Sequence, residues 1–217
     1  MGESIVLEAP RIIGFEEVTD RALAANEVRL RTLYSGISAG TELTAYRGTN
    51  VYLHKQWNQG QRLFVPGEAP SKQYPVRDLG YEESGEVIEV GSSVTRVKIG
   101  DIVCGTWGHR TMHIAAEDYA AGRLLPADLD PILGIYSHMA AIALNGILDA
   151  AIRLGETVAV FGLGVPGQIV AQMAKRSGSR VIGVDMMAAR LAKAVELAAV
   201  DVSLDASAGR IAEQIKA

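Results

Sequence analysis

The pattern of hydrophobic and polar positions changes character near residue 150. Before it, apolar and polar residues alternate partly along 28–34, a period of two that is typical of a half-buried strand. Residues 85–91 form another short strand-like run bounded by glycines, and 92–101 reads as a turn that leads into a strand at 102–105. Strand follows strand with little helix between, which predicts a small β-barrel or sandwich.

Beyond residue 150, strand-like and helix-like segments take turns. The pattern predicts helices at 139–153, 165–175 and 188–199, and strands at 156–161, 180–185 and 200–204. Such alternation implies parallel strands joined by right-handed crossovers. The predicted fold class is therefore α/β with a β-rich part, divided into domains at 1–150 and 151–217.

Residues 49–77 fit neither pattern, because they carry aromatic residues and prolines but few periodic apolar positions. We predict a long surface loop or excursion here. Long loops in compact domains are often functional, and an ordinary insertion is an equally open interpretation.

A glycine-rich turn is the strongest chemical motif. Gly162, Gly164 and Gly167 fit G-x-G-x-x-G, with Val165 and Pro166 inside the turn, between a predicted strand and a predicted helix. The first glycine permits a tight turn, the second lets the backbone approach a pyrophosphate, and the third lets helix and strand pack closely. Free N–H groups at the start of the helix favour phosphate charge. The turn is therefore predicted to bind a dinucleotide.

Asp185 ends the next predicted strand, 18 residues after Gly167 (185 − 167), near the ~20 residues at which an acid contacts the cofactor ribose. A carboxylate there accepts hydrogen bonds from both ribose hydroxyls and repels a 2′-phosphate. This favours NAD over NADP. The alternative is a structural glycine turn in which Asp185 caps a helix.

Composition and charge remove several classes of protein. The chain of 217 residues has a net charge of −4 and shows no basic stripe, so we expect no nucleic-acid partner. Cys104 is the single cysteine, which excludes an internal disulfide and a multi-cysteine zinc site, and its apolar surroundings indicate a buried thiol.

Targeting signals are also missing from the pattern. The N-terminus has neither the basic start nor the apolar core of a signal peptide. The longest apolar stretch, 131–152, is interrupted by Ser137, His138, Asn145 and Asp149, so a membrane span is a poor interpretation. We expect a cytoplasmic protein.

Three sequence blocks carry a family resemblance. Residues 80–87, Gly-Tyr-Glu-Glu-Ser-Gly-Glu-Val, look like a G-H-E-x-x-G-x-V block, and 90–103 continue it. Residues 36–42 with 46–48 resemble G-I-C-G-T-D…Y-x-G. Together with the glycine turn, these blocks resemble the medium-chain dehydrogenase/reductase family over nearly the whole chain. The resemblance implies a GroES-like β-barrel domain followed by a doubly wound Rossmann domain.

The resemblance also implies an activity. Family members transfer hydride between a nicotinamide and an alcohol, aldehyde, ketone or activated double bond, and act on small molecules, often as homodimers or homotetramers. Many use a catalytic zinc as a Lewis acid. Because the chain ends soon after the third predicted Rossmann strand, we expect an N-terminal portion that lacks the second half of the dinucleotide fold.

The zinc-ligand positions depart from the family pattern. The cysteine position falls on Ser38 or Ala39, the histidine position on Tyr81, and the third ligand near His138. The four-cysteine structural zinc lobe is absent. We therefore expect no standard catalytic zinc. A remnant metal site built from His138 and Glu82 remains an alternative, as does a zinc-dependent alcohol dehydrogenase.

Three residues at family positions are candidates for catalysis. Thr41 matches a hydroxyl residue that relays the alcohol proton, or else caps the short helix after it. Tyr81 could act as a general acid, or else packs as a half-buried tyrosine. His138 is a catalytic candidate or a satisfied core histidine. His109 and His113 are predicted to be structural or rim residues. The alternative to an enzyme is a catalytically inactive dinucleotide-binding module.

Overall fold

The computed structural model describes residues 2–19, 21–67, 69–77 and 79–216. The chain divides into two compact units, Met1–His138 and Met139–Ala217. This division falls near the start of helix α3 (Ser137–Asp149), whereas the sequence pattern places a boundary at residue 150. Most of α3 belongs with the second unit because side chains such as Ile147 pack against that unit's core.

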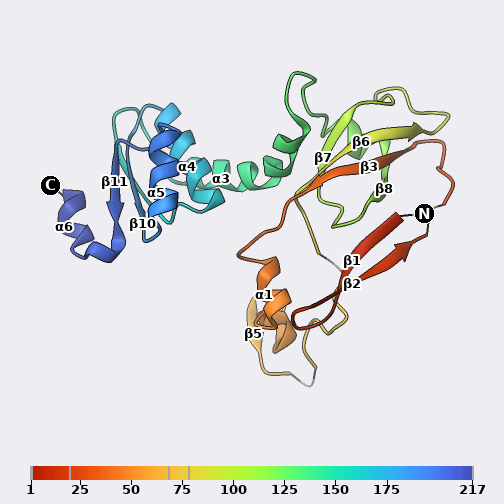
Figure 1. Ribbon diagram of the computed structural model, residues 1–217, viewed down its shortest axis with the longest axis horizontal. Helices are drawn as coiled ribbons and strands as arrows, with labels where there is room; N and C mark the ends of the chain where they lie inside the picture. Colours follow the sequence, from red (N-terminus) through yellow and green to blue (C-terminus); the bar gives the residue numbers. More distant parts are fainter. Residues whose placement is uncertain (1, 20, 68, 78, 217) are drawn as a thin grey trace. The chain divides into compact units, whose positions relative to one another are not determined.

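The first unit is built on an antiparallel sheet of four strands in the order β7–β6–β3–β8 (Figure 1). The strands are β3 (Glu27–Ser35), β6 (Glu83–Val90), β7 (Ile102–Gly105) and β8 (Met112–Ala116). Their buried side chains form one core cluster: Val28, Leu30, Val87, Val97, Val103, Trp107, Ala115 and Ala120. The strands predicted at 28–34, 85–91 and 102–105 are confirmed.

A hairpin of β1 (Gly2–Ala9) and β2 (Ile12–Val18) precedes this sheet, and the sequence analysis did not predict it. Ile12, Ile13 and Phe15 of β2 are exposed, so the hairpin lacks the buried apolar face that marks a strand in the sequence. Two backbone hydrogen bonds join the middle of β1 to segments outside the hairpin. The Ile5 N–H donates to His109 O at 2.9 Å, and the Leu7 N–H donates to Val76 O at 2.9 Å.

The predicted excursion at 49–77 has secondary structure of its own. It contains the short 3₁₀ helix η1 (Val51–Leu53) and a hairpin of β4 (Gln56–Asn58) and β5 (Leu63–Val65), next to helix α1 (Glu42–Arg47). Phe64 makes edge-on ring contacts with Tyr52 at 4.7 Å and with Trp57 at 4.9 Å. The first unit is completed by α2 (Glu117–Ala121) and η2 (Pro131–Tyr136).

The second unit is a parallel sheet in the order β11–β10–β9, packed with helices α4 and α5 (Figure 1). The elements are β9 (Thr157–Phe161), α4 (Val165–Arg176), β10 (Arg180–Asp185), α5 (Ala188–Glu196) and β11 (Val202–Asp205), followed by η3 (Ala206–Ala208) and α6 (Ile211–Lys216). The predicted alternation is confirmed. The helix predicted to reach residue 199 ends earlier, because Ala198 has a positive φ of 49°.

One helical stretch among the described residues is long and apolar enough to cross a membrane. It runs over Pro131–Asp149, and 17% of it is buried. Length and composition are the only evidence, and helices of soluble proteins pass the same test.

Candidate functional site

The glycine turn joins β9 to α4 and has the geometry that the motif requires. Gly162 has a φ of +86°, in the left-handed region that favours glycine. A Cβ on Gly167 would collide with the carbonyl oxygen of Gly162, whereas a Cβ on Gly164 would meet nothing within 4 Å. Pro166 lies in the first turn of α4, where a missing N–H breaks no hydrogen bond. The first glycine therefore permits the turn of the backbone, the third permits close packing, and the second leaves open space beside the backbone.

Asp185 supports this turn directly. Its side chain is 5% exposed at the end of β10. The Leu163 N–H donates to Oδ2 at 2.7 Å and the Met187 N–H donates to Oδ1 at 2.8 Å, with Arg190 Nη1 3.5 Å from Oδ2. Hydrogen bonds from Met187 and Leu163 lower the pKa of Asp185, with a smaller contribution from Arg190. The carboxylate is thus anionic at neutral pH, and these three partners occupy most of its roughly four lone-pair sites.

Both roles that the sequence analysis left open for Asp185 are compatible with this geometry. Met187 is the N-cap residue of α5, and its N–H donates to Asp185, so the carboxylate stabilises the start of this helix as a capping group does. Contact with a cofactor ribose stays a prediction.

Gln168 is a residue of the turn that the sequence analysis missed. Its Nε2 donates to Leu163 O at 3.2 Å and to Arg190 O at 2.8 Å, so it ties the turn to α5. No spacing rule marks such a glutamine, because its two partners come from different elements.

Two of the three catalytic candidates lie together. The rings of Tyr81 and His138 meet edge to face, with centroids 5.2 Å apart and planes at 68°. Both side chains are half-buried. Thr41 is exposed at the N-cap of α1, but its side chain makes no capping hydrogen bond. Over the described residues, no hydrogen bond or ring contact joins Thr41 to the Tyr81–His138 pair.

The donor set around these residues does not fit a zinc ion. Within the described ranges, no group of three or more His, Cys, Asp or Glu side chains is placed to hold a metal. Glu82 is 7% exposed, and a Cβ on Gly36 would lie 2.7 Å from its Oε2. Burial, followed by the charges of Glu42 and Glu83, raises the pKa of Glu82. Zinc binds the deprotonated form of a carboxyl group, so this shift works against Glu82 as a ligand.

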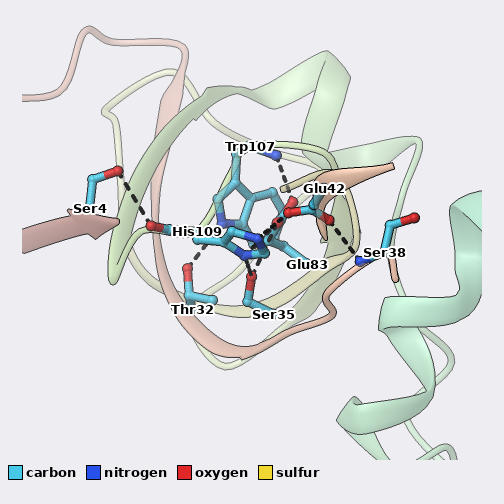
Figure 2. Close-up of polar contacts among 8 residues, drawn as sticks. All are labelled: Ser4, Thr32, Ser35, Ser38, Glu42, Glu83, Trp107 and His109. Atoms are coloured by element: carbon cyan, nitrogen blue, oxygen red, sulfur yellow. Dashed lines mark hydrogen bonds and ion pairs between the residues drawn. The ribbon is translucent and has the colours of Figure 1, made fainter. Parts of the chain in front are cut away.

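A buried polar cluster lies around His109 (Figure 2). His109 is 9% exposed, so it is not the rim residue that the sequence analysis allowed. Its Nε2 lies 2.5 Å from Glu42 Oε2, and its Nδ1 lies 2.6 Å from Ser35 Oγ. Ser35 Oγ donates in turn to Glu83 Oε1 at 3.2 Å. These partners are 67 and 74 residues away from His109 in the chain, which is why the pattern could not reveal them.

The cluster gathers several acids around one imidazole. Glu83 is fully buried and accepts a hydrogen bond from the Trp107 N–H at 2.9 Å. Burial raises the pKa of Glu83, although hydrogen bonds and the charge of His109 oppose this. Burial alone lowers the pKa of His109, but its hydrogen bond with Glu42 and the charges of Glu42, Glu83 and Glu82 raise it overall. The fold therefore favours a protonated His109.

Comparison with known proteins identifies the class. The alcohol dehydrogenase GroES-like domain family matches residues 24–147, which is more than half of the chain. The chain belongs to the medium-chain, zinc-type alcohol dehydrogenase-like family of oxidoreductases. The resemblance and the fold class predicted from the sequence are confirmed: a GroES-like β domain is followed by the start of a Rossmann fold.

Individual relatives agree with this assignment. The D-guloside 3-dehydrogenases of Escherichia coli K12 and Shigella flexneri are 36% identical over 194 residues, which cover 87% of this chain and 55% of theirs. In fold, 2R,3R-butanediol dehydrogenase from Bacillus subtilis matches with a TM-score of 0.73 at 23% identity, covering 100% of this chain and 68% of that one. Escherichia coli quinone oxidoreductase complexed with NADPH matches at 0.70 and 22% identity, covering 99% and 61%. The chain thus spans about half the length of the curated relatives it matches.

Proposed function

We propose that the protein is the N-terminal portion of an NAD-dependent oxidoreductase that transfers hydride to or from an alcohol, aldehyde, ketone or activated double bond without a standard catalytic zinc. The glycine turn carries this proposal. It places open space beside Gly164 at the start of α4, next to an anionic Asp185. A helix N-terminus with free N–H groups favours pyrophosphate charge there.

The preference for NAD over NADP rests on Asp185. Its carboxylate would accept a hydrogen bond from the cofactor ribose and would repel a 2′-phosphate. Arg190, 3.5 Å from Asp185 Oδ2, offsets part of that repulsion. The family uses NAD(P), and one structural relative holds NADPH, so the choice must be measured for this protein.

The substrate class follows from the relatives' names. D-Guloside 3-dehydrogenase is named for oxidation at position 3 of a sugar derivative, which bears a secondary hydroxyl group. We therefore place sugar-type secondary alcohols and the matching ketones first in a substrate panel, before aldehydes, quinones and enones. We further propose a small-molecule substrate, no nucleic-acid or membrane partner, a cytoplasmic location, and assembly as a homodimer or homotetramer.

Residues of the first unit would donate the proton and bind the substrate oxygen. The Tyr81 phenol donates a proton to the substrate oxygen in the reductive direction, and its ring is held in place by His138. Thr41 offers a hydroxyl group with no other hydrogen-bond partner in the described residues to the same oxygen. The bound nicotinamide supplies the hydride, so a ketone gains one hydride and one proton to become an alcohol.

Calorimetric titration with NADH and NADPH tests the cofactor proposal. We expect tighter NADH binding by the wild type, and loss of that preference in Asp185→Asn, which keeps the size of the side chain but removes its charge. Asp201→Asn is the matched control, because Asp201 also accepts a backbone N–H, from Val181 at 2.7 Å, but lies at the start of β11. Unchanged affinity for both cofactors in Asp185→Asn would overturn the assignment.

A turnover assay of the full-length protein with the same panel separates an enzyme from a binding module. Hydride transfer is followed by absorbance of NADH. NADH binding without turnover of any substrate would favour the catalytically inactive dinucleotide-binding module.

A further inference from the structure

We propose that His109 is a positioning residue, which in its protonated form holds the turn at 38–42, and with it Thr41, through the carboxylate of Glu42. The catalytic meaning of this role rests on the function proposed above for Thr41. The anchoring of the turn does not, so the two can be tested separately.

Glu42 links the turn to His109. Its Oε2 lies 2.5 Å from His109 Nε2, and its Oε1 accepts the Ser38 N–H at 2.8 Å (Figure 2). The Glu42 N–H donates to Ser38 O at 2.9 Å, which closes the same turn through the backbone. Thr41 stands directly before Glu42 and makes no side-chain hydrogen bond. The position of its hydroxyl group therefore depends on the backbone that Glu42 holds.

His109 is itself firmly anchored. Its N–H donates to Leu79 O at 2.9 Å, and its carbonyl accepts the Ile5 N–H at 2.9 Å and the Ser4 hydroxyl at 3.3 Å. The imidazole thus extends from backbone that is bound on two sides. A contact to such a residue restrains Glu42 more than a contact to a mobile surface side chain would.

The hydrogen-bond pattern calls for two protons on the ring. The Ser35 hydroxyl has one proton, which it donates to Glu83 Oε1, so it accepts from Nδ1–H of His109. Nε2 must then carry the second proton to donate to Glu42. The acids that face the ring are Glu42 from α1, Glu83 from β6, and Glu82 directly before β6.

Loss of that proton should loosen the turn. With a neutral His109, the carboxylate of Glu42 stays buried without a cation, which is costly in a low-dielectric environment. The folded-state pKa of His109 is raised above its ordinary value of 6.5. The anchor is therefore complete below about pH 6.5 and is lost as the pH rises through the folded-state pKa.

Amide hydrogen exchange tests whether His109 anchors the turn at 38–42. The exchange rates of Ser38 and Glu42 are followed from about pH 6 to about pH 10 and corrected for intrinsic rates. His109→Gln places an amide donor near the position of Nε2 but carries no charge and cannot titrate. Protection in this variant should therefore be independent of pH and stay at the level that the wild type reaches at alkaline pH. His109→Asn places its donor toward Ser35 instead, so protection should fall about tenfold. His54→Asn is the control, since His54 is exposed and contacts Gly48 O at the other end of α1.

The proposal is wrong if protection of the Ser38 amide in the wild type does not fall with rising pH. It is also wrong if His109→Asn and the wild type show equal protection. If His109→Asn does not fold, the comparison of the wild type with His109→Gln decides the matter alone. In turnover assays, His109→Asn should lower kcat about tenfold without changing the KM for NADH, and His109→Gln should remove the alkaline decline of kcat. Absence of turnover in the wild type would contradict the proposed function while the exchange result still stands.

Discussion

Gly167 lies so close to Gly162 that a Cβ on Gly167 would collide with the Gly162 carbonyl oxygen, well inside the 3.0 Å limit of real Cβ contacts. Between them in the sequence, Gly164 faces open space and has an ordinary φ of −67°. The three glycines of one motif thus have separable roles, because the fold requires two of them and leaves the middle one free for the ligand contact that we propose.

Replacing the glycines one at a time should separate folding from binding. Gly167→Ala should destabilise the protein by at least ~1–3 kcal/mol through overpacking. Gly164→Ala should leave the Tm nearly unchanged but weaken NADH binding at least about tenfold, because the methyl group occupies the space of the pyrophosphate. Thermal unfolding and calorimetry measure the two effects. Wild-type affinity in Gly164→Ala would show that no pyrophosphate approaches this backbone.

Removing the Tyr81 hydroxyl group tests the proposed proton donor. Tyr81→Phe keeps the ring that contacts His138, so the Tm should not change. Loss of a general acid should lower kcat by about 100-fold or more, while the KM for NADH stays the same. The pH profile of kcat for a ketone substrate provides the measurement. Full activity in this variant would make Tyr81 a packing residue.

His113 should make the first unit sensitive to acid. Its ring stacks on Trp107 with centroids 5.4 Å apart, and burial, followed by the charge of Arg110, lowers its pKa from 6.5 to about 4. The folded state favours the neutral ring, so this stabilisation is present above pH 6.5 and is lost as the pH falls toward 4. The difference amounts to at most ~3 kcal/mol.

His113→Phe keeps an aromatic ring against Trp107 and removes the titration. Denaturant unfolding at pH 7 and at about pH 4.5 should show a smaller loss of stability at acid pH in the variant than in the wild type. Parallel losses in the two proteins would mean that other groups cause the acid sensitivity.

Metal analysis tests the expected absence of a standard catalytic zinc. The purified protein should contain well below one zinc ion per chain, and a strong chelator should leave turnover unchanged. One zinc per chain that disappears in His138→Ala would support the zinc-dependent alternative. Glu82→Gln provides a second check, since a site that includes this carboxylate would also lose metal.

Local patterns in the sequence predicted much of the fold. The strands β3 and β6 alternate in part between apolar and polar positions, β7 is a short apolar run, and the glycine turn follows another run of apolar residues. The β1–β2 hairpin escaped prediction because residues such as Phe15 are exposed, so no period of two separates an inner from an outer face. The end of α5 at Glu196 is followed by a positive φ at Ala198 that the sequence does not signal.

The candidate site was only partly predictable. Family positions indicated Tyr81 and His138, and the structure brings their rings together. The cluster around His109 was missed because Ser35 and Glu42 are distant from His109 in sequence, and the pairing of β3 with β6 sets Ser35 opposite Glu83. Burial of several acids near one imidazole is a property of the fold, and no local motif records it.

The hydrogen bonds from Leu163 and Met187 to Asp185 also constrain how cofactor preference can evolve. With the role that we propose for Asp185, a single replacement by a residue without an acceptor would admit a 2′-phosphate and at the same time leave two backbone N–H groups without their acceptor. A lineage that changes preference must therefore first acquire another acceptor for those groups. The order of mutations is set by the turn, with structural compensation preceding any gain of a new cofactor.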